Sequence, residues 1–72
     1  MRLGERIRVS REKKGWQQRE LARAARIDHG WISRLESGDR NNLSLEAAAR
    51  LARALGVTVD YLAGMYEDAP YA

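Results

Sequence analysis

The side chains whose types could do chemistry are few in this chain, and their pattern argues against catalysis. There is one histidine and no cysteine, whereas a structural zinc site needs about four such ligands. Asp28 and His29 are adjacent, like part of a catalytic pair. However, neighbouring residues at the start of a helix point apart, and no nucleophile is placed to complete a triad. We therefore expect no enzyme, no metal site and no cofactor, with Asp28 as a helix cap.

The other charged side chains of the sequence give it an excess of positive charge. The chain carries 13 Lys and Arg against 10 Asp and Glu, which gives a formal net charge of +3. Two of the acidic residues, Glu67 and Asp68, lie near the C-terminus, so residues 1–64 have a net charge of +5. Such a charge suits a polyanion, but it is also common among proteins that bind none. Charge alone therefore leaves nucleic acid and other partners equally open.

The sequence shows no pattern typical of a membrane-spanning or secretory segment. The apolar stretches are only a few residues long, far below the roughly 20 residues that span a bilayer. Residues 1–6 have a basic start but no apolar stretch, so they do not form a secretory signal. The lack of cysteine fits a reducing compartment. We expect a cytoplasmic protein with no membrane partner.

Five short helices are predicted to position the polar side chains. Alanine and leucine supply most of the apolar content and favour helix. Glycines follow three of the helical runs, where a left-handed residue ends a helix, and residues with short side-chain oxygens precede three of them as caps. These glycines are Gly15, Gly38 and Gly56, and the caps are Asp28, Ser44 and Thr58. The expected helices are Leu3–Lys14, Gln18–Ala25, His29–Ser37, Leu45–Leu55 and Val59–Met65.

This pattern predicts an all-α fold, a compact bundle of about five short helices. A chain of 72 residues has room for one domain, which must be stabilised by a single core. We expect the domain to cover residues 1–66. Residues 67–72 have little to pack against and are expected to be a flexible tail.

The connection between the second and third helices is unusually short. Only Arg26 and Ile27 separate Ala25 from the cap at Asp28, so the two helices must meet at a sharp angle. Ala22 is small where they cross, and apolar side chains fill the inside of the corner: Leu21, Ala25, Ile27, Ile32 and Leu35. The outer face of the third helix is then free to enter a groove about 12 Å wide, the width of the DNA major groove.

Several short motifs stand in a fixed order along the chain. They are Gly4-Glu5-Arg6-Ile7-Arg8, Arg11-Glu12-Lys13-Lys14-Gly15, Gln18-Arg19-Glu20-Leu21-Ala22, Trp31-Ile32-Ser33-Arg34-Leu35-Glu36-Ser37-Gly38, Leu45-Glu46, residues 51–57 and Asp60-Tyr61-Leu62. As an ordered set over about Leu3 to Gly64, they resemble the phage-repressor and Cro type of helix-turn-helix protein, also called the xenobiotic-response-element family. The loop 40–45 also resembles controller proteins of restriction-modification systems.

The resemblance implies a sequence-specific regulator of transcription, a repressor, that binds a double-stranded DNA operator as a homodimer. It also implies a place at the nucleoid of a prokaryote, or a phage or plasmid context. The third helix would enter the major groove with four residues at base-facing positions: His29, Gly30, Ser33 and Arg34. Of these, the arginine can donate two hydrogen bonds to guanine. Phosphate contacts would come from Gln17, Gln18, Trp31, Ser37, Arg40 and Asn41. The resemblance further implies a structural pair between Arg11 and Glu36.

The expected dimer surface consists of apolar residues left over after the core is filled. These are Val59, Tyr61, Met65 and Tyr66, on the fifth helix and just beyond it. The alternative function is a protein-interaction module, such as an antitoxin-like or adaptor helix-turn-helix domain. The basic exposed face of the third helix argues against that alternative.

Three positions depart from the family pattern. Arg26 stands where the family usually has glycine. A side chain there costs roughly 1–2 kcal/mol if the turn keeps a left-handed residue, but the corner can also be closed by a right-handed route. Ser10 replaces a usual leucine on the inner side of the first helix, so it weakens the core or hides a hydrogen bond. Asn42-Leu43 replaces the frequent Asn-Pro, so that loop is expected to be more mobile.

Overall fold

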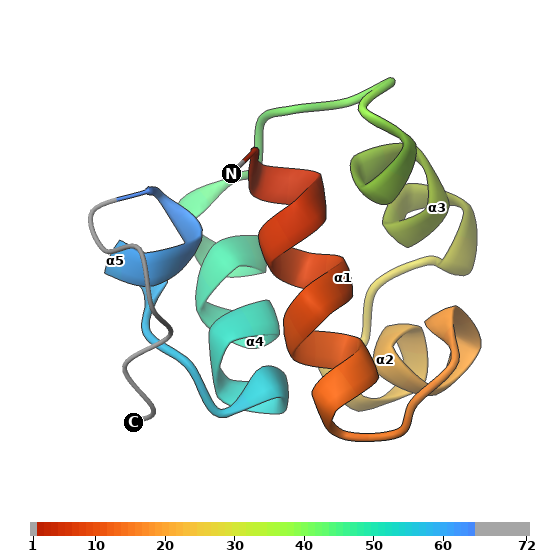
Figure 1. Cartoon of the computed structure of the whole chain (residues 1–72). Helices are drawn as coiled ribbons and strands as arrows, with labels where there is room; N and C mark the ends of the chain where they lie inside the picture. The colour runs from red at the N-terminus through yellow and green to blue at the C-terminus, as the bar shows by residue number, and fades with distance from the viewer. Residues whose placement is uncertain (1, 65–72) are drawn as a thin grey trace.

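Five helices follow one another in the computed structural model, which describes residues 2–64 (Figure 1). They are α1 (Leu3–Lys13), α2 (Gln18–Ala25), α3 (His29–Ser37), α4 (Leu45–Leu55) and α5 (Val59–Leu62). The all-α expectation is confirmed, and three of the five predicted helices have the bounds that the sequence indicated. α1 ends one residue early and α5 is a single turn that ends at Leu62, while the predicted end at Met65 lies outside the described residues. Within residues 2–64, no helix has the length and apolar character needed to cross a membrane.

Short oxygen-bearing side chains begin two of the helices as predicted. The Ser44 Oγ accepts a hydrogen bond from the Ala47 N–H at 3.1 Å, and the Thr58 Oγ1 accepts one from the Tyr61 N–H at 3.0 Å. Asp28 occupies the corresponding position before α3, but its carboxylate accepts no hydrogen bond from the first turn. One carboxylate oxygen, Oδ2, instead lies beside Gly30. The prediction of Asp28 as a hydrogen-bonding cap was therefore wrong, although the helix begins where expected.

The core lies where the helices face one another. Its buried side chains are Ile7, Leu21, Ala22, Ala25, Ile32, Leu35, Leu51, Ala52, Leu55, Val57, Tyr61 and Leu62. Five of them come from the corner between α2 and α3, and Trp16 and Ile27 pack against its edge. The predicted apolar corner is therefore confirmed.

The prediction that Tyr61 belongs to a dimer surface was wrong. Its side chain is only 2% exposed, so the surface of α5 cannot offer it to a second copy. The helix begins after the Thr58 cap, and this start turns Tyr61 and Leu62 inward while Asp60 faces outward. The guanidinium of Arg6 lies 5.0 Å from the centre of the tyrosine ring, a cation–π distance that fits a partly shielded site.

The turn between α2 and α3 contains a left-handed residue that is not glycine. Arg26 has φ 56° and ψ 48°, a conformation that costs a residue with a Cβ roughly 1–2 kcal/mol. The next residue, Ile27, donates its N–H to the Ala22 carbonyl oxygen at 2.9 Å. This bond satisfies a carbonyl at the helix end. The left-handed route expected for the family is thus kept despite the missing glycine.

α1 and α3 approach so closely that their backbones touch. Gly4 is buried in the first turn of α1, and a Cβ built at this position would overlap the carbonyl oxygen of Leu35. Glycine allows such contact because it has no side chain. The start of α1 therefore sets the position of the last turns of α3.

Ser10 is buried on the inner side of α1, where the family resemblance implies leucine. It is 3% exposed, and its Oγ has no hydrogen-bond partner among the described residues. A buried hydroxyl without a partner lowers stability, since its hydrogen bonds with water are lost on folding. We expect Ser10→Ala to raise the free energy of unfolding by about 1 kcal/mol, as measured by urea denaturation. A drop in stability would instead indicate a hydrogen bond that the hydroxyl makes in solution.

Candidate nucleic-acid interface

The outer face of α3 carries polar side chains while its inner face is part of the core. His29, Ser33 and Arg34 are exposed, whereas Ile32 and Leu35 are fully buried. Gly30 is half-buried. α3 lies at the edge of the bundle (Figure 1), so nothing in the described chain covers its polar side. Three of the four residues expected to face bases are therefore accessible to a partner.

A single carboxylate ties together three helices behind this face. Glu36 on α3 accepts two hydrogen bonds from the Arg11 guanidinium on α1, at 2.8 and 2.9 Å. It also accepts one from the Gln18 side-chain amide on α2 at 3.1 Å. Arg11 further donates to the Trp16 carbonyl oxygen at 2.7 Å. The Arg11–Glu36 pair that the resemblance implies is thus present and forms part of a larger network.

The Arg11–Glu36 pair is largely shielded from solvent. The Arg11 side chain is 11% exposed and that of Glu36 is 5% exposed, so water screens the attraction only weakly. Hydrogen bonding to Glu36 and its negative charge raise the pKa of the Arg11 guanidinium, although burial acts in the opposite direction. Both partners are held in one geometry, which fixes the angle of α3 against α1.

Gln18 also reaches toward the exposed face. Its Oε1 lies 3.4 Å from the His29 Nε2, at the long end of hydrogen-bonding distances. The first turn of α2 is closed by the Gln17 N–H, which donates to the Glu20 Oε1 at 2.7 Å. Gln17 itself is exposed and Gln18 half-buried. The start of α2 and the start of α3 therefore present their polar groups side by side.

A tight turn follows α3. The Arg34 carbonyl oxygen accepts hydrogen bonds from the Ser37 Oγ and from the Arg40 N–H, each at 3.1 Å. Arg40 then folds back so that its guanidinium lies over the Trp31 ring. Asn41 is exposed just beyond. The motifs gave no indication of this stack, because its partners are nine residues apart and are joined by an irregular turn.

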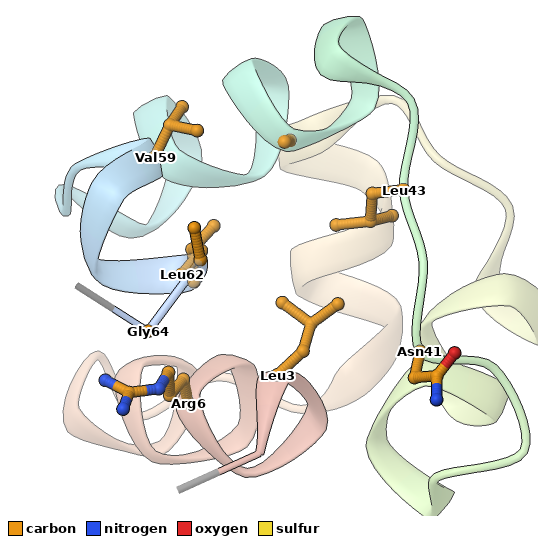
Figure 2. A pocket seen from close by; sticks show the side chains of 9 residues that line it. Leu3, Arg6, Asn41, Leu43, Val59, Leu62 and Gly64 are labelled. Atoms are coloured by element: carbon orange, nitrogen blue, oxygen red, sulfur yellow. The ribbon is translucent and has the colours of Figure 1, made fainter.

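A groove lies beside α5 and extends to Asn41 in the loop that follows α3. It has a volume of about 300 Å³ and lies between α1, the loop before α4, α4 and α5. Leu3, Leu43 and Leu62 point toward a common hollow in Figure 2, and Val59 stands at its edge. Met65 and Tyr66, which the sequence assigned to a dimer surface, lie outside the described residues. Among residues 2–64, no three His, Asp or Glu side chains gather in a way that could hold a metal ion.

Known proteins are similar to this chain in sequence and in the arrangement of its helices. The chain is 42% identical over 66 residues to the HTH-type transcriptional regulator DdrOP3 of Deinococcus deserti, covering 90% of this chain and 50% of that protein. The N-terminal DNA-binding domain of SinR from Bacillus subtilis superposes with a TM-score of 0.85 at 27% identity, covering 92% and 96% of the two chains. A crystal structure of SinR in complex with DNA gives a TM-score of 0.82 at 30% identity, covering 85% and 97%.

The comparisons also define the family. This chain spans about half the length of the curated relatives that it matches. A family model described as a helix-turn-helix domain matches residues 2–63, which is nearly all of the described structure. The chain therefore belongs to the helix-turn-helix family of the λ-repressor-like type.

Proposed function

We propose that this domain is a sequence-specific DNA-binding regulator of transcription that places α3 in the major groove of double-stranded DNA. The observation that carries the proposal is the division of α3 into two faces. Ile32 and Leu35 anchor it in the core, while His29, Ser33 and Arg34 remain exposed. The crystal structure of the similar protein SinR in complex with DNA supports DNA binding by this fold.

The polar residues divide into two proposed groups. Arg34, His29 and Ser33 would donate hydrogen bonds to base edges, and Gly30 would let the backbone approach the DNA closely. Phosphate contacts, which fix register but carry no direct sequence information, would come from residues on either side of this face. These are Gln17, Gln18, Trp31, Ser37, Arg40 and Asn41. The positive end of the α2 helix dipole favours a phosphate there.

We further propose that the domain acts as a homodimer and as a repressor in the cytoplasm. One recognition helix reads too few base pairs for typical specific affinity, and two half-sites one helical turn apart remedy this.

The groove beside Val59, whose lining joins leucines to the polar side chains of Arg6 and Asn41, supports a dimer surface near α5. Met65 and Tyr66 remain proposed members of that surface, without the buried Tyr61. The specific likeness to restriction-modification controller proteins stays a prediction.

Selection of binding sites from random duplexes tests this function directly. We expect an enriched motif with two-fold symmetry, because a homodimer presents two identical recognition helices. The affinity for the selected duplex should fall as salt increases, with a slope in log–log form of about −0.9 for each phosphate neutralised. No enrichment together with a flat salt response would contradict DNA binding, whereas an asymmetric single motif would contradict only the dimer.

Arg34 is the residue proposed to read a base most specifically. We expect Arg34→Ala to weaken binding to the selected duplex by about 1–3 kcal/mol and to relax the base preference at one position of each half-site. Arg53→Ala on α4 removes the same charge from an exposed site outside the proposed interface, and serves as the control. Affinities for a panel of single-base variants check the result. A uniform loss across that panel would make Arg34 a phosphate contact.

A further inference from the structure

The stack of Arg40 on Trp31 holds a cation beside the recognition helix. The guanidinium carbon of Arg40 lies 3.8 Å from the centre of the Trp31 ring. At this distance the two planar groups are in van der Waals contact, with the added attraction between a cation and an aromatic face. Both residues are half-buried, and Trp31 in turn packs against the core. The aromatic platform is therefore anchored to the body of the domain.

The backbone of Arg40 is fixed as well. Its N–H donates to the Arg34 carbonyl oxygen at 3.1 Å, and the Ser37 Oγ donates to the same oxygen at 3.1 Å. The Asp39 N–H donates to the Ser37 Oγ at 3.3 Å. These bonds fold the turn back onto the last turn of α3. Arg40 is thus held at its backbone and at its guanidinium, although a free arginine side chain has many rotamers.

We propose that Trp31 is a positioning residue, which fixes Arg40 as a phosphate-binding cation at the C-terminal end of α3. This inference rests on the proposed DNA-binding function and deepens it. A stack covers one face of the guanidinium and leaves its edge N–H groups available for phosphate oxygens. Since the side chain is ordered before DNA arrives, less conformational freedom is lost on binding.

The same geometry argues against Trp31 as a platform for a nucleotide base. One face of the indole is already covered by Arg40, and the ring is partly packed against the core. Paired bases in a duplex are in any case stacked on one another, so they offer no free face. The main effect of the ring on DNA binding is therefore exerted through the arginine.

A double-mutant cycle tests this coupling. Trp31→Leu removes the aromatic face but keeps an apolar side chain, and Arg40→Lys keeps the charge but removes the planar group. We expect each change to weaken binding to the selected duplex about three- to tenfold. The double variant should bind little worse than either single variant, since both changes break one interaction. Trp31→Phe should keep most of the affinity.

Unrelated duplexes provide a second comparison. Phosphates occur in every sequence, so the loss caused by Arg40→Lys should be of similar proportion on unrelated duplex DNA. Arg53→Lys on α4 is the matched control, with no expected change. If Trp31→Leu fails to fold, the affinity of the Arg40→Lys variant for DNA remains as a test. Wild-type affinity in the Arg40→Lys variant would overturn the inference.

A measurement without DNA separates the inference from the function on which it rests. In the free protein, the ring current of Trp31 should shift the NMR signals of the Arg40 side chain upfield, and Trp31→Leu should abolish this shift. Unshifted Arg40 signals, or losses that simply add in the double variant, would overturn the positioning role while the protein still binds DNA. If the wild-type protein binds no duplex, the proposed function fails, and the phosphate-binding role of Arg40 fails with it, even where the stack is seen by NMR.

Discussion

Replacement of Gly4 by alanine is expected to lower the free energy of unfolding by about 3 kcal/mol or more. The added Cβ would overlap the Leu35 carbonyl oxygen, and would lie 3.0 Å from the Leu35 carbonyl carbon and 3.1 Å from the Glu36 Cα. All three atoms belong to backbone, so no side chain can rotate away. The overlap is relieved only if α1 and α3 move apart, which opens the core between them.

The expected loss of about 3 kcal/mol is the net value, after the greater helix propensity of alanine has offset about 1 kcal/mol of the strain. Since a domain of this size is marginally stable, we expect a melting temperature lowered by about 15 °C or more. Thermal and urea unfolding followed by circular dichroism measure the effect. Gly30→Ala is the matched control, because its Cβ meets only a carboxylate oxygen of Asp28 at 2.9 Å, which can rotate away. Equal effects of the two changes would contradict the close contact of α1 with α3.

Glu36→Ala is expected to destabilise the domain by about 3 kcal/mol. The change leaves the shielded guanidinium of Arg11 without its carboxylate and removes the acceptor of the Gln18 amide. A buried charge that loses its partner is far more costly than an exposed one. Urea denaturation at neutral pH measures the loss. An effect below about 1 kcal/mol would place this pair with ordinary surface ion pairs.

The exposed pair of Arg50 and Glu46 on α4 supplies the comparison. Its side chains are 45% and 78% exposed, with a separation of 3.2 Å. Glu46→Ala should therefore cost less than about 1 kcal/mol. Arg11→Met combined with Glu36→Leu should recover much of the stability lost in Glu36→Ala, since apolar pairs often replace buried ion pairs without loss. DNA affinity in that double variant should remain reduced, because the angle of α3 is no longer fixed.

The helices and the corner between α2 and α3 could be predicted because glycines, helix caps and apolar periodicity indicated the same helix ends. Glycines followed α1, α3 and α4 close to where the apolar periodicity ended, and the serine and threonine caps began α4 and α5. α2 ended instead at a left-handed residue with a side chain, Arg26. Short spacing between Ala25 and Asp28 then forced the sharp angle. Such features depend on neighbours in the chain, so they are visible in one sequence.

The features that the sequence did not predict correctly depend on contacts between distant residues. α5 is a single turn of four residues, too short for a helical period to reveal that Tyr61 points inward. The closeness of Gly4 to Leu35 joins two helices through their backbones, and no residue pattern encodes such a distance. Trp31 and Arg40 meet through a turn of irregular shape. Each of these depends on tertiary geometry rather than on local propensity.

The Glu36 carboxylate has a consequence for how a duplex would be recognised. Because it links α1, α2 and α3 through hydrogen bonds, the recognition helix is part of a rigid body and cannot tilt on its own. In the proposed complex, imperfect fit must then be corrected by bending or twisting of the double helix. Discrimination between operators would thus extend to base pairs that the protein never touches, through the ease with which each sequence deforms.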